Sequence, residues 1–165
     1  MASLTLGGNP VNTVGDLPPV GSPAPAFTLA GADLSDVTPD AYSGKKIVLN
    51  IFPSIDTATC ATSVRTFNER VADRDDAVVL CVSEDLPFAQ SRFCGAEGLT
   101  SVATASAFRS DFGETYGVKL VDGKLAGLLA RAVVVLDGSG TVVHTELVPE
   151  IASEPDYDAA LAAIG

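Results

Sequence analysis

The chain has 165 residues and a formal net charge of -11, with an apolar fraction of 47% and an aromatic fraction of 6%. This length fits a single domain, residues 1–165, with an aliphatic core large enough to need no disulfide or metal support. The negative charge argues against nucleic acid or an anionic membrane as a partner. No segment of the sequence approaches the length needed to span a bilayer.

The N-terminus and the cysteines point to a reducing location. Residues 1–8 have neither a basic region nor an apolar stretch of signal-peptide length, so a cytoplasmic protein is expected. In that compartment Cys60, Cys81 and Cys94 favour catalytic, redox-active or buried roles over structural disulfides. Their spacing fits neither a CxxC pair nor a zinc site, and His144 is the only histidine. No metal or other cofactor is therefore expected.

The first half of the chain predicts strands. Apolar and polar residues alternate between positions 4 and 14 around a Gly-Gly-Asn-Pro turn, which predicts a β-hairpin. This hairpin forms an N-terminal extension, residues 1–16. A proline-rich connector leads into a short strand at residues 26–29. Apolar runs at residues 47–52 and 77–83 are typical of strands buried on both faces of a parallel sheet.

Helices are predicted between and after these strands. The expected helices cover residues 60–73, 86–95, 107–116 and 156–164, and the further strands cover residues 101–105, 128–137 and 141–148. The last two strands are joined by Gly138-Ser139-Gly140, which predicts a hairpin turn. This order indicates a thioredoxin-like α/β fold, a central mixed sheet flanked by helices, with an extra N-terminal β-hairpin.

One stretch, residues 46–60, runs from a buried strand into a polar turn that ends in Cys60. Asp56, Thr57 and Thr59 are residue types that commonly cap helix N-termini. Apolar residues recur after the cysteine with helical spacing, so Cys60 is expected in the first turn of a helix. Because the N–H groups of a helix N-terminus favour an anion, a thiol there ionises more easily. A small buried cysteine without function is an equal alternative on position alone.

The spacing Pro53-x-x-x-Thr57-x-x-Cys60 resembles the peroxidatic signature of the peroxiredoxin family. Pro53 would shape the loop and exclude water, and the Thr57 hydroxyl would contact the oxygens of a bound peroxide. Cys60 would attack the O–O bond as a thiolate and become a sulfenic acid. Arg131 stands in an otherwise apolar predicted strand, so it needs an anionic partner. The Cys60 thiolate is one such anion, and an ordinary carboxylate is the alternative.

The resemblance covers essentially the full length and points to one branch of that family. The segments Asn50–Ser54, Ala61–Phe67, Asp85–Cys94 and Gly127–Arg131 look like the thiol peroxidases, the atypical two-cysteine peroxiredoxins of bacteria. This resemblance implies a homodimer of thioredoxin fold. It also implies reduction of hydrogen peroxide and alkyl hydroperoxides, with thioredoxin as the electron donor.

The same resemblance implies roles for individual residues. Cys60 would be the peroxidatic cysteine and Cys94 the resolving cysteine, joined in an intramolecular disulfide during the cycle. Pro53, Thr57 and Arg131 would complete the pocket that binds the hydroperoxide. These five residues are the predicted site.

One departure from the branch lies in the active-site turn. The relatives usually have Thr-Pro-Val-Cys, whereas this chain has Thr57-Ala58-Thr59-Cys60. Losing the second proline is expected to loosen the turn, and so to alter rate or mobility without abolishing function.

The other cysteines and the histidine leave alternatives open. From the sequence alone, Cys94 could equally be a helix-end cysteine packed on the core. Two cysteines near helix ends are expected to meet only after local unwinding, which predicts a redox-linked conformational change. Cys81 is expected to be inert core, and His144 a surface or edge residue. A disulfide oxidoreductase is disfavoured because CxxC is absent, and a redox-sensing binding module is the alternative from another class.

Overall fold

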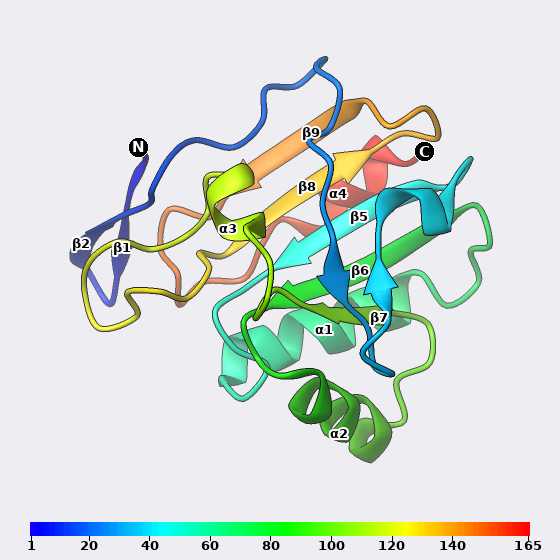
Figure 1. Cartoon of the computed structure of the whole chain (residues 1–165), viewed down its shortest axis with the longest axis horizontal. Coiled ribbons are helices and arrows are strands. Elements are labelled where there is room, and N and C mark those ends of the chain that lie inside the picture. The colour runs from blue at the N-terminus through cyan, green and yellow to red at the C-terminus, as the bar shows by residue number, and fades with distance from the viewer.

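A seven-stranded mixed sheet runs through the centre of the molecule (Figure 1). The structure is a computed structural model that describes residues 1–165. The strands are β1 (Ser3–Leu6), β2 (Asn9–Asn12), β3 (Leu29–Ala30), β4 (Asp36–Val37), β5 (Lys46–Ile51), β6 (Ala77–Ser83), β7 (Ala103–Ser106), β8 (Ala132–Leu136) and β9 (Val142–Leu147). The helices are η1 (Pro39–Tyr42), α1 (Ala58–Arg70), α2 (Pro87–Glu97), α3 (Phe112–Thr115) and α4 (Tyr157–Ala163).

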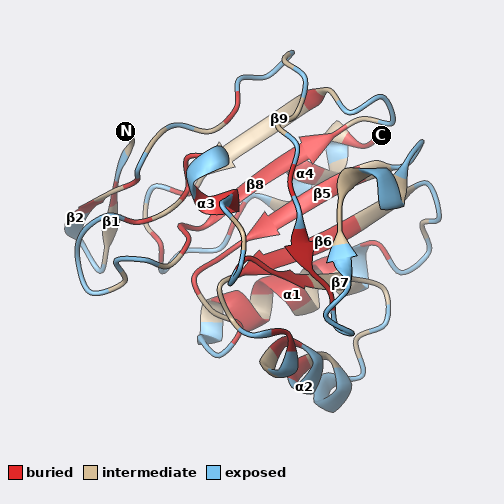
Figure 2. Cartoon of the chain, in the orientation of Figure 1, coloured by how far each residue is buried: buried red, intermediate tan, exposed pale blue.

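The strand order of the sheet is β4-β3-β7-β6-β5-β8-β9. The strands β5, β6 and β7 are parallel, whereas β8 runs antiparallel to β5 and β9 antiparallel to β8. The central strands are buried on both faces (Figure 2), which explains their continuous apolar composition. His144 was expected at the surface or at an edge, and it lies half-buried on β9, an edge strand of the sheet.

Two apolar clusters fill the two faces of the sheet. On one face α1, α2 and α4 contribute Phe67, Phe93 and Ala160 to a cluster with residues of β5, β6 and β8. On the other face the short α3 and the N-terminal connector supply Phe112 and Phe27. None of the helices combines the length and apolar character that a membrane span requires. The layers confirm the thioredoxin-like α/β arrangement predicted from the sequence.

The predicted N-terminal hairpin is present and forms its own two-stranded sheet, β1 with β2. Leu4 and Val11 of the hairpin join a small apolar cluster with Leu120, Ala130 and Ile151. The hairpin therefore lies against the segment that precedes β8 and against the loop that follows β9. These two segments also meet each other where Arg131 donates to the carbonyl of Ile151.

Some predicted boundaries were wrong, and each has a local cause. The strand expected at residues 128–137 starts only at Ala132, because the preceding residues pair with residues 118–120 and not with the sheet. Arg131 thus precedes β8. The helix expected at residues 107–116 shrinks to α3, since Ser106 and Ser110 side chains accept from backbone N–H groups and form turns there.

The end of α2 also differs from the prediction. Gly98, and not Gly95, adopts the left-handed conformation that ends the helix, with φ of 67°. Cys94 therefore sits in the last full turn of α2, and its carbonyl accepts from the N–H groups of Gly98 and Leu99.

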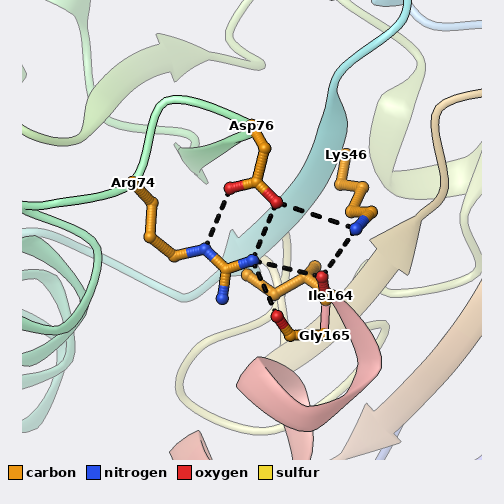
Figure 3. A network of polar contacts seen from close by, with 5 residues as sticks. All are labelled: Lys46, Arg74, Asp76, Ile164 and Gly165. Carbon is orange, nitrogen blue, oxygen red and sulfur yellow. Dashed lines mark hydrogen bonds and ion pairs between the residues drawn. The ribbon is translucent and has the colours of Figure 1, made fainter.

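A network of polar contacts lies at the start of β5 (Figure 3). The Arg74 guanidinium makes two hydrogen bonds to the Asp76 carboxylate, at 3.1 and 2.9 Å. It also donates to the carbonyls of Ile164 and Gly165, while Lys46 donates to Ile164 at 2.8 Å. This network ties the C-terminus to the end of β5 that lies opposite the Cys60 turn.

Candidate active site

The turn between β5 and α1 places Cys60 as the sequence predicted. The strand ends at Ile51, Pro53 is buried directly after it, and Thr57 takes the N-cap position before α1 begins at Ala58. Cys60 is the third residue of α1, a helix of 13 residues, and its exposed fraction is 0%. The thiol therefore lies in the first helical turn, where the helix dipole favours negative charge.

Arg131 is the charged partner of this thiol. Its Nη2 donates to the Cys60 Sγ at 3.2 Å, and its Nε donates to the carbonyl of Ile151 at 2.7 Å. β8 runs antiparallel to β5 with Ala132 opposite Ile51, so the residue before β8 falls beside the start of α1. The alternative carboxylate partner is not observed, because no carboxylate forms an ion pair with Arg131.

The electrostatics of this contact favour a reactive sulfur. Arg131 is only 2% exposed, so water screens its positive charge poorly, and this charge lies directly against the Cys60 sulfur. Its Nη1 is buried without a hydrogen-bond partner. A buried donor of this kind can stabilise negative charge that develops on an oxygen during a reaction.

Asp85 braces the turn that carries Cys60, and the sequence analysis did not identify this role. Its carboxylate accepts from the Ser54 hydroxyl at 2.7 Å, from the Ile55 N–H at 2.7 Å and from the Ser83 hydroxyl at 2.6 Å. Gln90 of α2 donates to Ser83 from the other side. Asp85 stands two residues before Pro87, the first residue of α2, so its position in the sequence suggests only a helix cap. The fold brings it to Ser54, which is 31 positions away in the chain.

Thr57 lies at the surface of the same turn. Its hydroxyl donates to the carbonyl of Ser54 at 3.0 Å, and the side chain is exposed. An open hollow of about 430 Å³ lies over the first turn of α1. It is lined by Ile55, Asp56, Thr57, Ala58, Ala61, Thr62, Arg65 and Phe93. Cys60 does not line this hollow, so its thiol lies beneath the surface on which Thr57 is found.

Cys94 is separate from Cys60 in this structure. All three cysteines are free, and Cys94 is half-buried on α2 at the edge of the same apolar cluster that contains Cys60. Burial raises the pKa of the Cys94 thiol. Cys94 also lines an open hollow between α2, β7 and the loop around Asp33.

Cys81 lies in the middle of β6 and is fully buried. Burial raises the pKa of the Cys81 thiol to about 12, and its nearest polar partner is the amide of Asn50 at 3.7 Å. The structure thus agrees with an inert core cysteine. No group of three or more His, Cys, Asp or Glu side chains is arranged to hold a metal ion.

Two ion pairs join α2 to the Cys60 turn and to α1. Arg92 donates to Asp56 at 3.0 Å, and Arg65 makes two hydrogen bonds to Glu97, the shorter at 2.7 Å. The Arg65 guanidinium also lies 5.5 Å from the centroid of the Phe93 ring. These contacts hold α2, the helix that carries Cys94, against the Cys60 turn and α1.

The fold and the buried thiol–guanidinium pair define a thiol-based redox protein of thioredoxin-like fold. A family model described as Redoxin matches residues 19–161. The thiol peroxidase of Mycobacterium tuberculosis is 66% identical over 165 residues, which is 100% of this chain and 99% of that protein.

Two solved structures are also similar to this chain. A peroxiredoxin-like protein from Aquifex aeolicus has a TM-score of 0.94 at 40% identity, with 99% of this chain and 96% of that chain covered. The thiol peroxidase from Chromobacterium violaceum has a TM-score of 0.89 at 21% identity, with 97% and 93% covered, and so supports the fold alone. The chain belongs to the redoxin family, and within it to the bacterial thiol peroxidases, enzymes of the peroxiredoxin type.

Proposed function

We propose that this enzyme reduces hydroperoxides through Cys60, with Arg131 as its charge partner. The observation that carries the proposal is the 3.2 Å contact between Arg131 Nη2 and Cys60 Sγ, in a site where both side chains are buried. A guanidinium held on the sulfur of a helix N-terminal cysteine favours the nucleophilic thiolate form.

The reaction is a two-electron oxidation of this sulfur. The Cys60 thiolate attacks one oxygen of the hydroperoxide, an S–O bond forms and the O–O bond breaks. The departing oxygen takes up a proton and leaves as water or an alcohol, so Cys60 becomes a sulfenic acid. The unpartnered Nη1 of Arg131 is the group that stabilises the charge on the departing oxygen.

The remaining pocket residues belong to the turn before α1. Pro53, buried at the end of β5, shapes this turn and keeps water from the sulfur. Thr57 contacts the peroxide oxygens once its hydroxyl leaves the carbonyl of Ser54. Hydrogen peroxide and alkyl hydroperoxides are the proposed substrates, and the open hollow over the first turn of α1 is the proposed approach.

Cys94 is the proposed resolving cysteine. Its thiol attacks the Cys60 sulfenic acid, the disulfide forms, and the sulfenic oxygen leaves as water with the Cys94 proton. Since both thiols are free and α2 is held by ion pairs, this step needs α2 to unwind or shift. The hollow beside Cys94 supports access of a reductant to that side of the disulfide.

Completion of the cycle requires two electrons and two protons from outside. A dithiol protein of the thioredoxin type is the proposed donor, because thiol–disulfide exchange regenerates both cysteines. We further propose that the enzyme works in the cytoplasm, where such donors are kept reduced, as a homodimer. We also propose that residues 1–165 act as one domain, which the contact of the hairpin with Ile151 supports.

Cysteine variants test this assignment directly. We expect Cys60→Ser to lose hydroperoxide reduction, because serine has no thiolate. Cys94→Ser should accumulate a Cys60 sulfenic acid that dimedone labels, and should lose turnover with thioredoxin. Cys81→Ala is the matched control and should keep activity. A Cys60→Ser variant that retains full peroxidase activity would overturn the proposal.

A further inference from the structure

Two consecutive backbone carbonyls of one loop accept hydrogen bonds from Arg131 and from Thr59, the two residues that flank the Cys60 sulfur in space and in sequence. The loop follows β9, and the carbonyl of Ile151 accepts from Arg131 Nε at 2.7 Å. The next carbonyl, that of Ala152, accepts from the hydroxyl of Thr59 at 3.1 Å. Because Thr59 directly precedes Cys60, this loop fixes the guanidinium and the first turn of α1 relative to each other.

The side chain of Glu150 fixes the conformation of this loop. Its carboxylate accepts from the Ala152 N–H at 2.8 Å, from the Gly7 and Gly8 N–H groups at 3.1 and 2.9 Å, and from the Thr5 hydroxyl at 3.0 Å. These hydrogen bonds, that from Ala152 first and that from Gly8 next, lower the pKa of Glu150 to about 2. The group is therefore a carboxylate at neutral pH.

The turn of the N-terminal hairpin is shaped to receive this carboxylate. Gly7 and Gly8 have φ values of 58° and 82°, a backbone conformation that residues other than glycine rarely adopt. In this turn the N–H groups of both glycines donate to one carboxylate, so the turn forms an anion site. Here the anion is Glu150 of the same chain.

Backbone hydrogen bonds continue the link beside Glu150. The Thr5 N–H donates to the carbonyl of Pro149 and the Thr5 carbonyl accepts from the Ile151 N–H, both at 2.8 Å. The hairpin, Glu150, the Ile151 carbonyl, Arg131 and the Cys60 sulfur thus form one continuous series of contacts.

We propose that Glu150 is a positioning residue for the peroxidatic reaction, and that it acts by fastening the N-terminal hairpin to the loop whose carbonyls orient Arg131 and Thr59. The proposal rests on the proposed role of Cys60. The hairpin would then contribute to the reaction, although it is far from Cys60 in the sequence.

The test uses Glu150→Gln in the full-length enzyme. Glutamine keeps the size of the side chain but cannot accept all four hydrogen bonds, so the loop whose Ile151 carbonyl orients Arg131 is held less firmly. We expect the rate of Cys60 oxidation by hydrogen peroxide to fall about tenfold, which is the effect of losing roughly one hydrogen bond to a charged group. The rate of Cys60 alkylation by iodoacetamide at pH 7 should fall in parallel, because the Arg131 guanidinium is held less firmly against the sulfur.

A matched control separates positioning from general stability. Asp122 also fastens the hairpin, through two hydrogen bonds of 2.8 Å from Asn12, but it does not contact the loop around Ile151. Asp122→Asn should lower the melting temperature as Glu150→Gln does and leave both Cys60 readouts unchanged. A second variant, Thr59→Val, removes only the hydroxyl that reaches Ala152 and should give a smaller loss of rate.

The outcomes distinguish this inference from the assignment of Cys60 itself. Mass spectrometry of the wild-type enzyme after peroxide must first place the oxidation on Cys60, and oxidation elsewhere would reject the proposed function. If Cys60 is oxidised but Glu150→Gln matches the wild type in the rates of oxidation and alkylation, the positioning role is rejected. Equal shifts in Asp122→Asn would also reject it.

Discussion

Two arginines near opposite ends of β5 do different work. Arg74, near the start of the strand, is partly exposed and has hydrogen bonds to Asp76 and to two terminal carbonyls (Figure 3). Arg131, near the end of the strand, is 2% exposed, contacts a sulfur and one carbonyl, and leaves Nη1 without a partner. The first guanidinium is matched by a permanent anion, whereas the second faces a group that becomes an anion only when it ionises.

This difference indicates that Arg74 has a structural role and that Arg131 has a role in the reaction. An exposed ion pair is screened by water and contributes little to stability. A buried guanidinium without a carboxylate is costly unless another anion is stabilised in return. At Arg131 the groups that are stabilised are the Cys60 thiolate and the charge that develops on a peroxide oxygen. The burial of this guanidinium therefore destabilises the fold but assists the reaction.

The largest expected effect is at the buried arginine. Arg131→Met keeps an unbranched apolar side chain but removes the guanidinium and its charge, so the rate of peroxide reduction should fall about 10²- to 10³-fold, as when one charge-stabilising donor is removed from an enzyme. Stability should stay the same or rise, because no buried cation remains to be compensated. Stopped-flow oxidation and thermal unfolding measure the two effects. A rate within threefold of the wild type would remove the distinction between the two arginines.

The matching change at the exposed site should be much weaker. Arg74→Met should lower the melting temperature by no more than about 4 °C, because it removes an exposed pair and the bonds to the C-terminal carbonyls. The peroxidase rate should not change, since the network lies at the opposite end of β5. Steady-state kinetics beside calorimetry checks this, and a tenfold loss of rate would show that the C-terminal network reaches the active site.

The smallest effect concerns acid stability at the same network. The hydrogen bond from Arg74 lowers the pKa of Asp76 from 3.8 to about 2. Its stabilising contribution is therefore full above pH 3.8 and is lost as the pH falls toward 2, because the unfolded state binds the proton first. Asp76→Asn should flatten the stability curve slightly in that window and leave its slope above pH 5 unchanged. Urea unfolding at several pH values tests this, and a change confined to neutral pH would contradict it.

The parts of the fold that could be predicted from the sequence are those that depend on residues close together in the chain. The apolar runs of β5 and β6 and the place of Cys60 in the first turn of a helix were predicted because each is encoded by neighbouring residues. Arg131 was identified as the charge in an apolar segment, but its strand was wrong because residues 128–130 pair with a distant segment.

The contacts that shape the site were missed for the same reason. Asp85 reaches Ser54 across 31 positions, and Glu150 reaches Gly7 across 143 positions. Neither spacing is visible in one sequence, since an aspartate before a helix and a glutamate in a loop are ordinary surface residues. Thr59, noted as a departure from the usual turn, proves to contact Ala152, and this bond offers the turn a restraint in place of the missing proline.

The most direct test of the account is a cysteine map of the reduced enzyme after one equivalent of hydrogen peroxide, read by mass spectrometry with and without reductant. The account predicts a Cys60–Cys94 disulfide, with Cys81 still a thiol, and a sulfenic acid on Cys60 when Cys94→Ser is treated in the same way. Oxidation of Cys94 or Cys81 with Cys60 left unmodified would contradict the claim that the sulfur held by Arg131 is the reacting group.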